Sequence, residues 1–132
     1  MMSALVKIND ESARGETTNS LHLNLISERL SVRELIQRRV QQEVEKFNLQ
    51  RPICFKALVQ PEGAQELENG FRLPEHRSLD WNVQAEEAIN AFERKSFFVM
   101  VDGKELKSLD EQIVLTDKSL VSFIKLMPVI AG

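Results

Sequence analysis

The sequence predicts an α+β fold, in which a mixed β-sheet packs on one main helix and an inserted segment contains a second helix. Three patterns in the 132 residues lead to this prediction. Residues 4–9 and 20–26 have the alternating apolar and polar side chains of half-buried strands. Residues 29–47 carry apolar side chains at helical spacing. Residues 96–127 contain two further apolar segments of strand length, the first followed by an Asp-Gly turn.

Composition limits the class of protein. Hydrophobic residues make up 42% and charged residues 28% of the chain, which is typical of a globular protein and too apolar for disorder. The length is that of one domain, residues 1–132, with enough chain to bury a core without disulfides. A net charge of −3 argues against a nucleic-acid partner, because binders of phosphate carry a basic surplus.

Neither a leader peptide nor a membrane-spanning run is visible in the sequence, so no membrane partner is expected. The single cysteine, Cys54, cannot form an internal disulfide and is predicted to be a buried apolar side chain. His22 is predicted to lie on the solvent face of a strand. Together these features indicate the cytoplasm.

The first two strands are predicted to form a hairpin around a long polar loop, residues 10–19. The main helix follows. Ser31 is its predicted N-cap, and Glu34 completes a capping box. The clustered arginines of this region, Arg29, Arg33, Arg38 and Arg39, are interpreted as part of a solvated helix face. The predicted apolar stripe consists of Val32, Leu35, Ile36, Val40, Val44 and Phe47.

The insertion is predicted to span about residues 48–96. Its first part, 48–80, contains three prolines and is expected to be largely irregular. A second helix is predicted to begin after Asp80, with an apolar face that packs inward. Residues 96–101 are predicted to be a strand covered on both faces, Asp102-Gly103 a turn, and residues 120–127 the last strand.

The chain carries no signature of an enzyme. No Ser/His/Asp set, phosphate-binding glycine loop or metal-ligand spacing is present, so catalytic and metal-ligating residues are not expected. Glu86 and Glu87 are adjacent on a helix and diverge, so they cannot act as a paired acid and base.

The final residues are apolar. Pro128 lacks an N–H and ends strand pairing, so residues 128–132 are expected to form an extended tail beyond the fold. Pro128, Val129, Ile130 and Ala131 are therefore the predicted partner-binding residues, since an exposed apolar tail tends to have a partner.

Three segments of the chain resemble the ubiquitin-like β-grasp family, and particularly its bacterial branch with the molybdopterin and thiamine sulfur carriers. They are ERLSVRELI at the helix start, FFVMVDGKELKSLDEQIVLTDKSLVSFI, and the ending LMPVIAG. The chain as a whole resembles the ubiquitin-like component of bacterial conjugation operons. One departure is the residue before the terminal glycine, where Ala131 replaces the glycine of the family.

The resemblance implies a β-grasp fold and a protein modifier. In such proteins the terminal glycine, here Gly132, is adenylated by an activating enzyme and passed through a conjugating-enzyme thioester to a target amine. ATP and Mg²⁺ are used by the activating enzyme, so this chain is expected to bind no cofactor. A deconjugating metalloprotease is a further implied partner. Glycine suits this position because it has no Cβ and permits close backbone approach.

Two other functions remain open. The chain is a sulfur carrier if the adenylate becomes a terminal thiocarboxylate, or a non-covalent β-grasp interaction module if the tail is only a docking strand. Fold resemblance does not decide among these three. The target of conjugation and the role of the insertion are not readable from the sequence.

Overall fold

The computed structural model describes residues 4–73 and 77–126, in an α+β arrangement with a five-stranded mixed sheet and two helices. The predicted tail, 128–132, lies outside the described residues. Within the described ranges the elements are β1 (Ala4–Ser12), β2 (Thr17–Leu25), β3 (Arg29–Ser31), α1 (Val32–Gln50), β4 (Gln65–Leu67), β5 (Gly70–Arg72), α2 (Trp81–Glu93), β6 (Phe97–Val101), β7 (Lys104–Leu106), β8 (Gln112–Val114) and β9 (Val121–Lys125).

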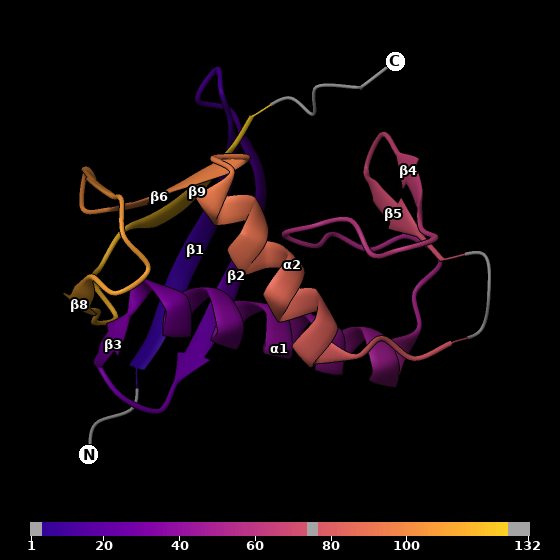
Figure 1. The fold of residues 1–132 in the computed structure, drawn as a ribbon, viewed down its shortest axis with the longest axis horizontal. Coiled ribbons are helices and arrows are strands. Elements are labelled where there is room, and N and C mark those ends of the chain that lie inside the picture. The colour runs from indigo at the N-terminus through magenta and orange to yellow at the C-terminus, as the bar shows by residue number, and fades with distance from the viewer. Residues whose placement is uncertain (1–3, 74–76, 127–132) are drawn as a thin grey trace.

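The main sheet has the strand order β2-β1-β9-β6-β7 (Figure 1). The first and last strands, β1 and β9, are neighbours and run parallel, with Ile8 opposite Val121. All other pairs of this sheet are antiparallel. Two small antiparallel pairs, β3 with β8 and β4 with β5, lie outside it. The first and last strands of the described chain thus lie side by side in the middle of the sheet.

The first hairpin is confirmed, but its loop is shorter than predicted. Strand β1 continues to Ser12 and β2 begins at Thr17, so most of the polar stretch 10–19 is paired. Composition misled the prediction because Asp10, whose polar side chain is typical of a turn, is buried in a strand and satisfied by Arg39 from α1.

Helix α1 begins where the sequence predicts. The Ser31 hydroxyl accepts from the Glu34 N–H at 3.1 Å, and the Glu34 carboxylate accepts from the Ser31 N–H at 3.2 Å, which is a complete capping box. The predicted apolar stripe is buried against the sheet. The helix runs three residues beyond the predicted end, to Gln50, and closes on Arg51 in the left-handed conformation.

Helix α2 is also confirmed, with Asp80 as its N-cap. At its other end Lys95 has φ +62°, and two bonds close the helix: Lys95 N–H to Phe92 O, and Ser96 N–H to Ala91 O. This is a Schellman ending, whose left-handed position is usually occupied by glycine. A lysine with a Cβ there holds a conformation that costs about 1–2 kcal/mol.

Residues 51–80, which we call the connecting segment, join the two helices. The described residues of this segment, 51–73 and 77–80, are mostly irregular, as predicted, apart from the β4–β5 hairpin and a backbone bridge between Phe55 and Phe71. Gly70 has φ +144°, and a Cβ at this position would lie 2.4 Å from the Phe55 carbonyl oxygen. Only glycine permits this close approach of the two backbones.

The main core lies between the sheet and α1, with α2 packed beside α1 (Figure 1). The fully buried members include Val6, Leu23, Val99 and Phe123. On the other face of the sheet, Phe98 and Met100 of β6 are half-buried. The prediction that β6 is covered on both faces is therefore wrong, because both helices pack on the same side.

Candidate functional site

The residues predicted as the site, Gly132 with the tail residues Pro128, Val129, Ile130 and Ala131, lie outside the described part of the chain. The structure does describe β9, the strand that leads toward them, and continues to Leu126. The surroundings of the end of β9 are thus the described part of the candidate site.

A buried ion pair joins β1 to α1 beside β9. The Nη1 and Nη2 atoms of Arg39 donate to the two carboxylate oxygens of Asp10 at 2.5 and 2.6 Å. Asn19 donates to the same carboxylate at 3.2 Å. Arg39 is 0% exposed and Asp10 is 1% exposed. A two-point contact of this kind is among the strongest side-chain hydrogen-bond arrangements, and neither charge can be left alone in the interior.

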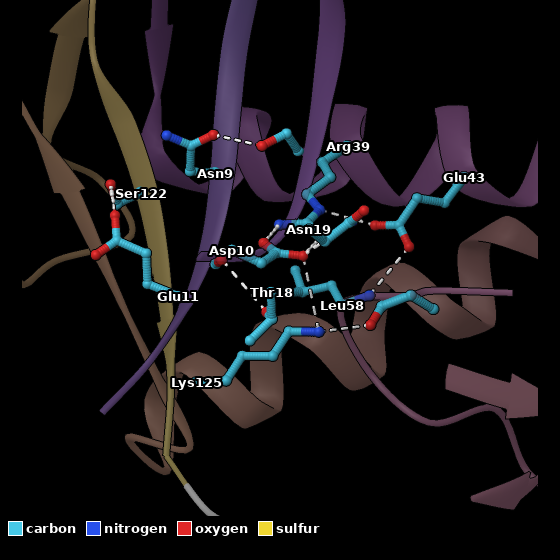
Figure 2. A network of polar contacts seen from close by, with 12 residues as sticks. Asn9, Asp10, Glu11, Thr18, Asn19, Arg39, Glu43, Leu58, Ser122 and Lys125 are labelled. Carbon is cyan, nitrogen blue, oxygen red and sulfur yellow. Dashed lines mark hydrogen bonds and ion pairs between the residues drawn. The ribbon is translucent and has the colours of Figure 1, made fainter. Parts of the chain in front are cut away.

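Two more ionisable side chains extend this pair to a set of four, which we call the buried charge cluster: Asp10, Arg39, Glu43 and Lys125 (Figure 2). Glu43 accepts from Arg39 Nε at 2.8 Å. The Lys125 ammonium lies 3.9 Å from Asp10 Oδ2. The Arg39 guanidinium carbon also lies 4.6 Å from the centre of the Phe123 ring, a cation–π contact. The cluster therefore links β1, α1 and β9.

The cluster also attaches the connecting segment. Glu43 accepts from the Leu58 N–H at 3.0 Å, and Lys125 donates to the Ala57 carbonyl at 2.7 Å. Figure 2 shows these two contacts on the side of the cluster away from β1. Among the described residues, every buried side-chain nitrogen or oxygen has a hydrogen-bond partner. The cluster is thus a satisfied network, which is the condition for buried charge to be tolerated.

The two carboxyl groups of the cluster are shifted in opposite directions. Burial alone raises the pKa of Asp10, but the hydrogen bonds and positive charge of Arg39, with help from Lys125, outweigh it and the net pKa is lowered. Burial raises the pKa of Glu43, and Arg39 offsets this only in part. Burial lowers the pKa of Lys125. Burial acts in the same direction on Arg39, but the negative charges and hydrogen bonds of Glu43 and Asp10 outweigh it, so the net pKa of Arg39 is raised.

A groove of about 620 Å³ lies beside the end of β9, between the connecting segment and the C-terminal end of α2; we call it the exit groove. Leu126 lines it and donates its N–H to the Ser96 carbonyl at 3.2 Å. Its apolar lining includes Leu58, Val59, Phe71, Ala91 and Phe97. Arg94 and Lys95 bring positive charge to the groove, and Glu66 and Glu87 bring negative charge.

The sequence prediction for Arg39 was wrong. This arginine was assigned to a solvated helix face, yet it is fully buried. A signal was present, because Arg39 and Glu43 occupy the same helical stripe as Val32, Ile36 and Phe47. A charge pair at i and i+4 within an apolar stripe indicates a buried network rather than a surface pair.

Cys54 was also predicted wrongly, since it is exposed. Its neighbour Ile53 is 83% exposed. The backbone around these residues runs across the surface, and only Phe55 turns inward, with its ring 4.5 Å from that of Phe47 between centroids. His22 lies on the solvent face of β2, as predicted.

The chemistry open to the described residues is limited. Arg39 and Asp10 have almost no contact with solvent, so this pair can hold elements together but cannot meet a substrate, whereas the Glu43 and Lys125 side chains are 14% and 34% exposed. No three His, Cys, Asp or Glu side chains gather as metal ligands within residues 4–73 and 77–126. In the same ranges, neither helix is both long enough and apolar enough to cross a membrane.

No family model matches the chain, and no curated protein or solved structure matches it either.

Proposed function

We propose that this chain is a bacterial ubiquitin-like protein modifier with a β-grasp fold. The observation that carries the proposal is the topology of the main sheet. Its first and last strands run parallel at the centre, hairpins flank them, and α1 lies across one face (Figure 1). This is the arrangement that the sequence resemblance implies. It supports the fold directly and the function by analogy alone.

The surroundings of β9 support the use of the following residues as a delivered tail. β9 is hydrogen-bonded to a strand on each side, β1 and β6. Its last residue, Lys125, is anchored to Asp10 and to the Ala57 carbonyl. The point at which the chain leaves β9 is therefore fixed relative to the sheet. A fixed departure point lowers the entropy cost of guiding a short segment into a narrow active site.

The proposed chemistry has four steps, all catalysed by partners. The Gly132 carboxylate attacks the α-phosphate of ATP, which forms an acyl-adenylate and releases pyrophosphate. A cysteine thiolate then displaces AMP and forms a thioester, which passes to a second cysteine on the conjugating enzyme. Finally, a target amine attacks the thioester carbonyl, forms an amide and releases the thiol. The activating enzyme holds ATP and Mg²⁺, and this chain contributes the carboxylate and the docking surface.

This chemistry requires a suitable compartment, an extended tail and a free terminal carboxylate. The proposal places the protein in the cytoplasm, where ATP and reduced thiols are present. It assigns Val129 and Ile130 to an extended segment held by main-chain hydrogen bonds in the activating enzyme. If residues follow Gly132 in a longer precursor, a protease must remove them, and a deconjugating metalloprotease is the partner that the resemblance implies.

The test is the intact mass of the chain after incubation with ATP, Mg²⁺ and a candidate activating enzyme, with and without a candidate conjugating enzyme. A thioester adduct that is lost by exchange with an added thiol, and an amide adduct that survives the thiol, are expected. In a parallel incubation with added sulfide, which can displace AMP from the adenylate, replacement of one oxygen by sulfur would instead assign the chain to the sulfur carriers. An unchanged mass with both enzymes would contradict the modifier and favour a docking module.

Deletion of Gly132 is the matched variant. It is expected to abolish the adducts while leaving the thermal midpoint of unfolding unchanged, because the deleted residue lies seven positions beyond β9. Insertion of one glycine after Gly132 is the control for chain length. A substantial fall in the thermal midpoint on deletion would show that the tail is part of the fold and would count against the proposal.

A further inference from the structure

The outer edge of the main sheet at β2 is partly closed by side chains. Lys56 donates to the Thr18 carbonyl. Gln42 donates to the His22 carbonyl at 2.7 Å and accepts from the Asn24 N–H at 3.1 Å. Arg38 donates to the Asn24 carbonyl at 2.9 Å. These side chains occupy backbone groups that would otherwise pair with another strand.

Ser20 lies between the closed positions. Alternate residues of a strand direct both backbone groups to the same edge, so the N–H and C=O of Ser20 face outward like those of His22 and Asn24. Among the described residues, no side chain binds either group, and the Ser20 hydroxyl is engaged elsewhere, with Asn9 at 2.8 Å. One donor and one acceptor are therefore open at this point of the edge.

A groove of about 350 Å³ lies directly beside Ser20, between β2, the second half of α1 and residues 52–56; we call it the edge groove. Its apolar lining comes from Leu21, Phe47 and Phe55. An apolar pocket next to an open strand edge is the combination used when an extended peptide adds to a sheet, because the edge binds its backbone and the pocket binds alternate side chains.

The free charge of the edge groove is positive. Lys46 and Lys56 line it and are exposed. The acidic residue of the lining, Glu43, is already engaged by Arg39 at 2.8 Å. Neither lysine forms an ion pair with another described residue. The groove thus favours a ligand with negative charge beside an apolar side chain.

We propose that the edge groove binds a short extended segment of a partner protein, which places an apolar side chain in the pocket, acidic side chains beside Lys46 and Lys56, and its backbone against Ser20. The closed positions on both sides limit the added strand to a few residues. This inference does not rest on the modifier function, because the edge groove and the tail use different parts of the fold.

The experiment selects random dodecapeptides, displayed on phage, against the full chain. Enriched peptides are synthesised, their affinities are measured by calorimetry, and their sites are mapped from amide chemical shifts of the labelled protein. The expected peptides alternate apolar residues with Asp or Glu and shift the Ser20 amide. Absence of enrichment, peptides without acidic residues, or shifts confined to another surface would overturn the proposal.

Charge reversal tests the lysines. Lys46→Glu is expected to weaken the selected peptides by about tenfold or more, since it replaces attraction by repulsion at the groove. The matched control is Lys118→Glu, which makes the same change of net charge in the exposed turn before β9 and should alter affinity by less than about twofold. Equal losses in the two variants would indicate general electrostatic attraction and would overturn the specific site.

Backbone pairing is tested on both partners. Ser20→Pro removes the outward N–H, and proline is tolerated at an edge position of this orientation. The affinity for the selected peptides is expected to fall by about fivefold to tenfold, which corresponds to the loss of one hydrogen bond. Ser20→Ala keeps the N–H and should leave the affinity unchanged. Peptides methylated at single backbone nitrogens give the same test on the unaltered protein. Losses at alternate positions are expected, and equal tolerance at every position would rule out strand addition.

Discussion

The body of the fold and the connecting segment are stabilised in different ways. The body, formed by the main sheet and α1, buries a continuous apolar core that includes Val6, Ile36 and Phe123. In its described parts, 51–73 and 77–80, the connecting segment buries few apolar side chains, chiefly Leu58 and Leu79, and both residues also make directed polar contacts, to Glu43 and to Asn48. Apolar burial is insensitive to direction, whereas polar attachment fixes a position. The connecting segment is thus attached to the body at two places, through the buried charge cluster at Ala57 and Leu58 and through Asn48 at Leu79.

The largest effect is expected from Arg39→Ala, which removes the nearest counter-charge of Asp10 and Glu43 and leaves only the Lys125 ammonium, 3.9 Å from Asp10. The free energy of unfolding should fall by about 3–5 kcal/mol, because removing one partner of a buried pair strands the other. Urea unfolding followed by circular dichroism measures the change. Arg33→Ala is the matched control, since Arg33 is 4.0 Å from Asp110 and both side chains are exposed. The control should change stability by less than about 1 kcal/mol. Similar losses in both variants would contradict the role of the cluster.

A smaller and local effect is expected from Glu43→Ala. It removes the acceptor of the Leu58 N–H, at a cost of about 1–3 kcal/mol for a hydrogen bond to a charged group. Amide hydrogen exchange at Leu58 and its neighbours should accelerate more than exchange at Ile8 in β1. Glu45→Ala, on the solvent face of the same helix, provides the comparison. Uniform acceleration across the sheet would show that the segment and the body unfold together.

The pH dependence should have two parts of opposite sign. The folded pKa of Asp10 lies below its unfolded value of about 3.9, so its contribution is present above that value and is lost as the pH falls through the folded pKa. The folded pKa of Glu43 lies above its unfolded value of about 4.3, so the folded protein takes up this proton first and acidification toward that value adds stability. Urea midpoints should hold or rise slightly from neutral pH to about 4.5, then fall. Asp10→Asn should flatten the acid limb at the expense of stability at neutral pH.

The smallest effect is expected from Lys95→Gly. Lys95 lines the exit groove and closes α2, so this change tests the stability of the helix end that faces the connecting segment. The left-handed conformation at φ +62° is unstrained for glycine, so stability should rise by about 1 kcal/mol, measured as the thermal midpoint. Lys95→Ala keeps the Cβ and should give no such gain. A loss of stability in the glycine variant would show that the lysine side chain makes a stabilising contact that outweighs the backbone strain.

Local sequence signals predicted the elements of the body. The Ser31 and Glu34 capping box, the alternation of Leu21 and Leu23, and the Asp102-Gly103 turn all depend on neighbours a few residues away. The main errors concern residues whose partners are distant in sequence. Asp10 is stable in a strand only because Arg39 reaches it from 29 positions away, and the Arg39 prediction failed for the same reason.

The candidate site was less predictable than the fold. The tail was recognised from composition and resemblance, and its residues lie outside the described ranges. The exit groove and the edge groove both require the connecting segment, whose path over the surface follows from close contacts such as Gly70 against Phe55. The glycine was visible in the sequence, but the residue that it approaches was not.

The parallel pairing of β1 with β9 has a consequence for how the protein is made. Residue 8 pairs with residue 121, so the central strand of the sheet is missing until nearly all of the described chain has left the ribosome. Pairings between such distant residues form late and slowly. A chain that ends before residue 121 leaves β1 and β6 without the strand between them and exposes apolar surface of the kind that proteases and chaperones act on. Premature termination before β9 is therefore expected to give misfolded chains, and the folded population is expected to consist of chains that extend through β9.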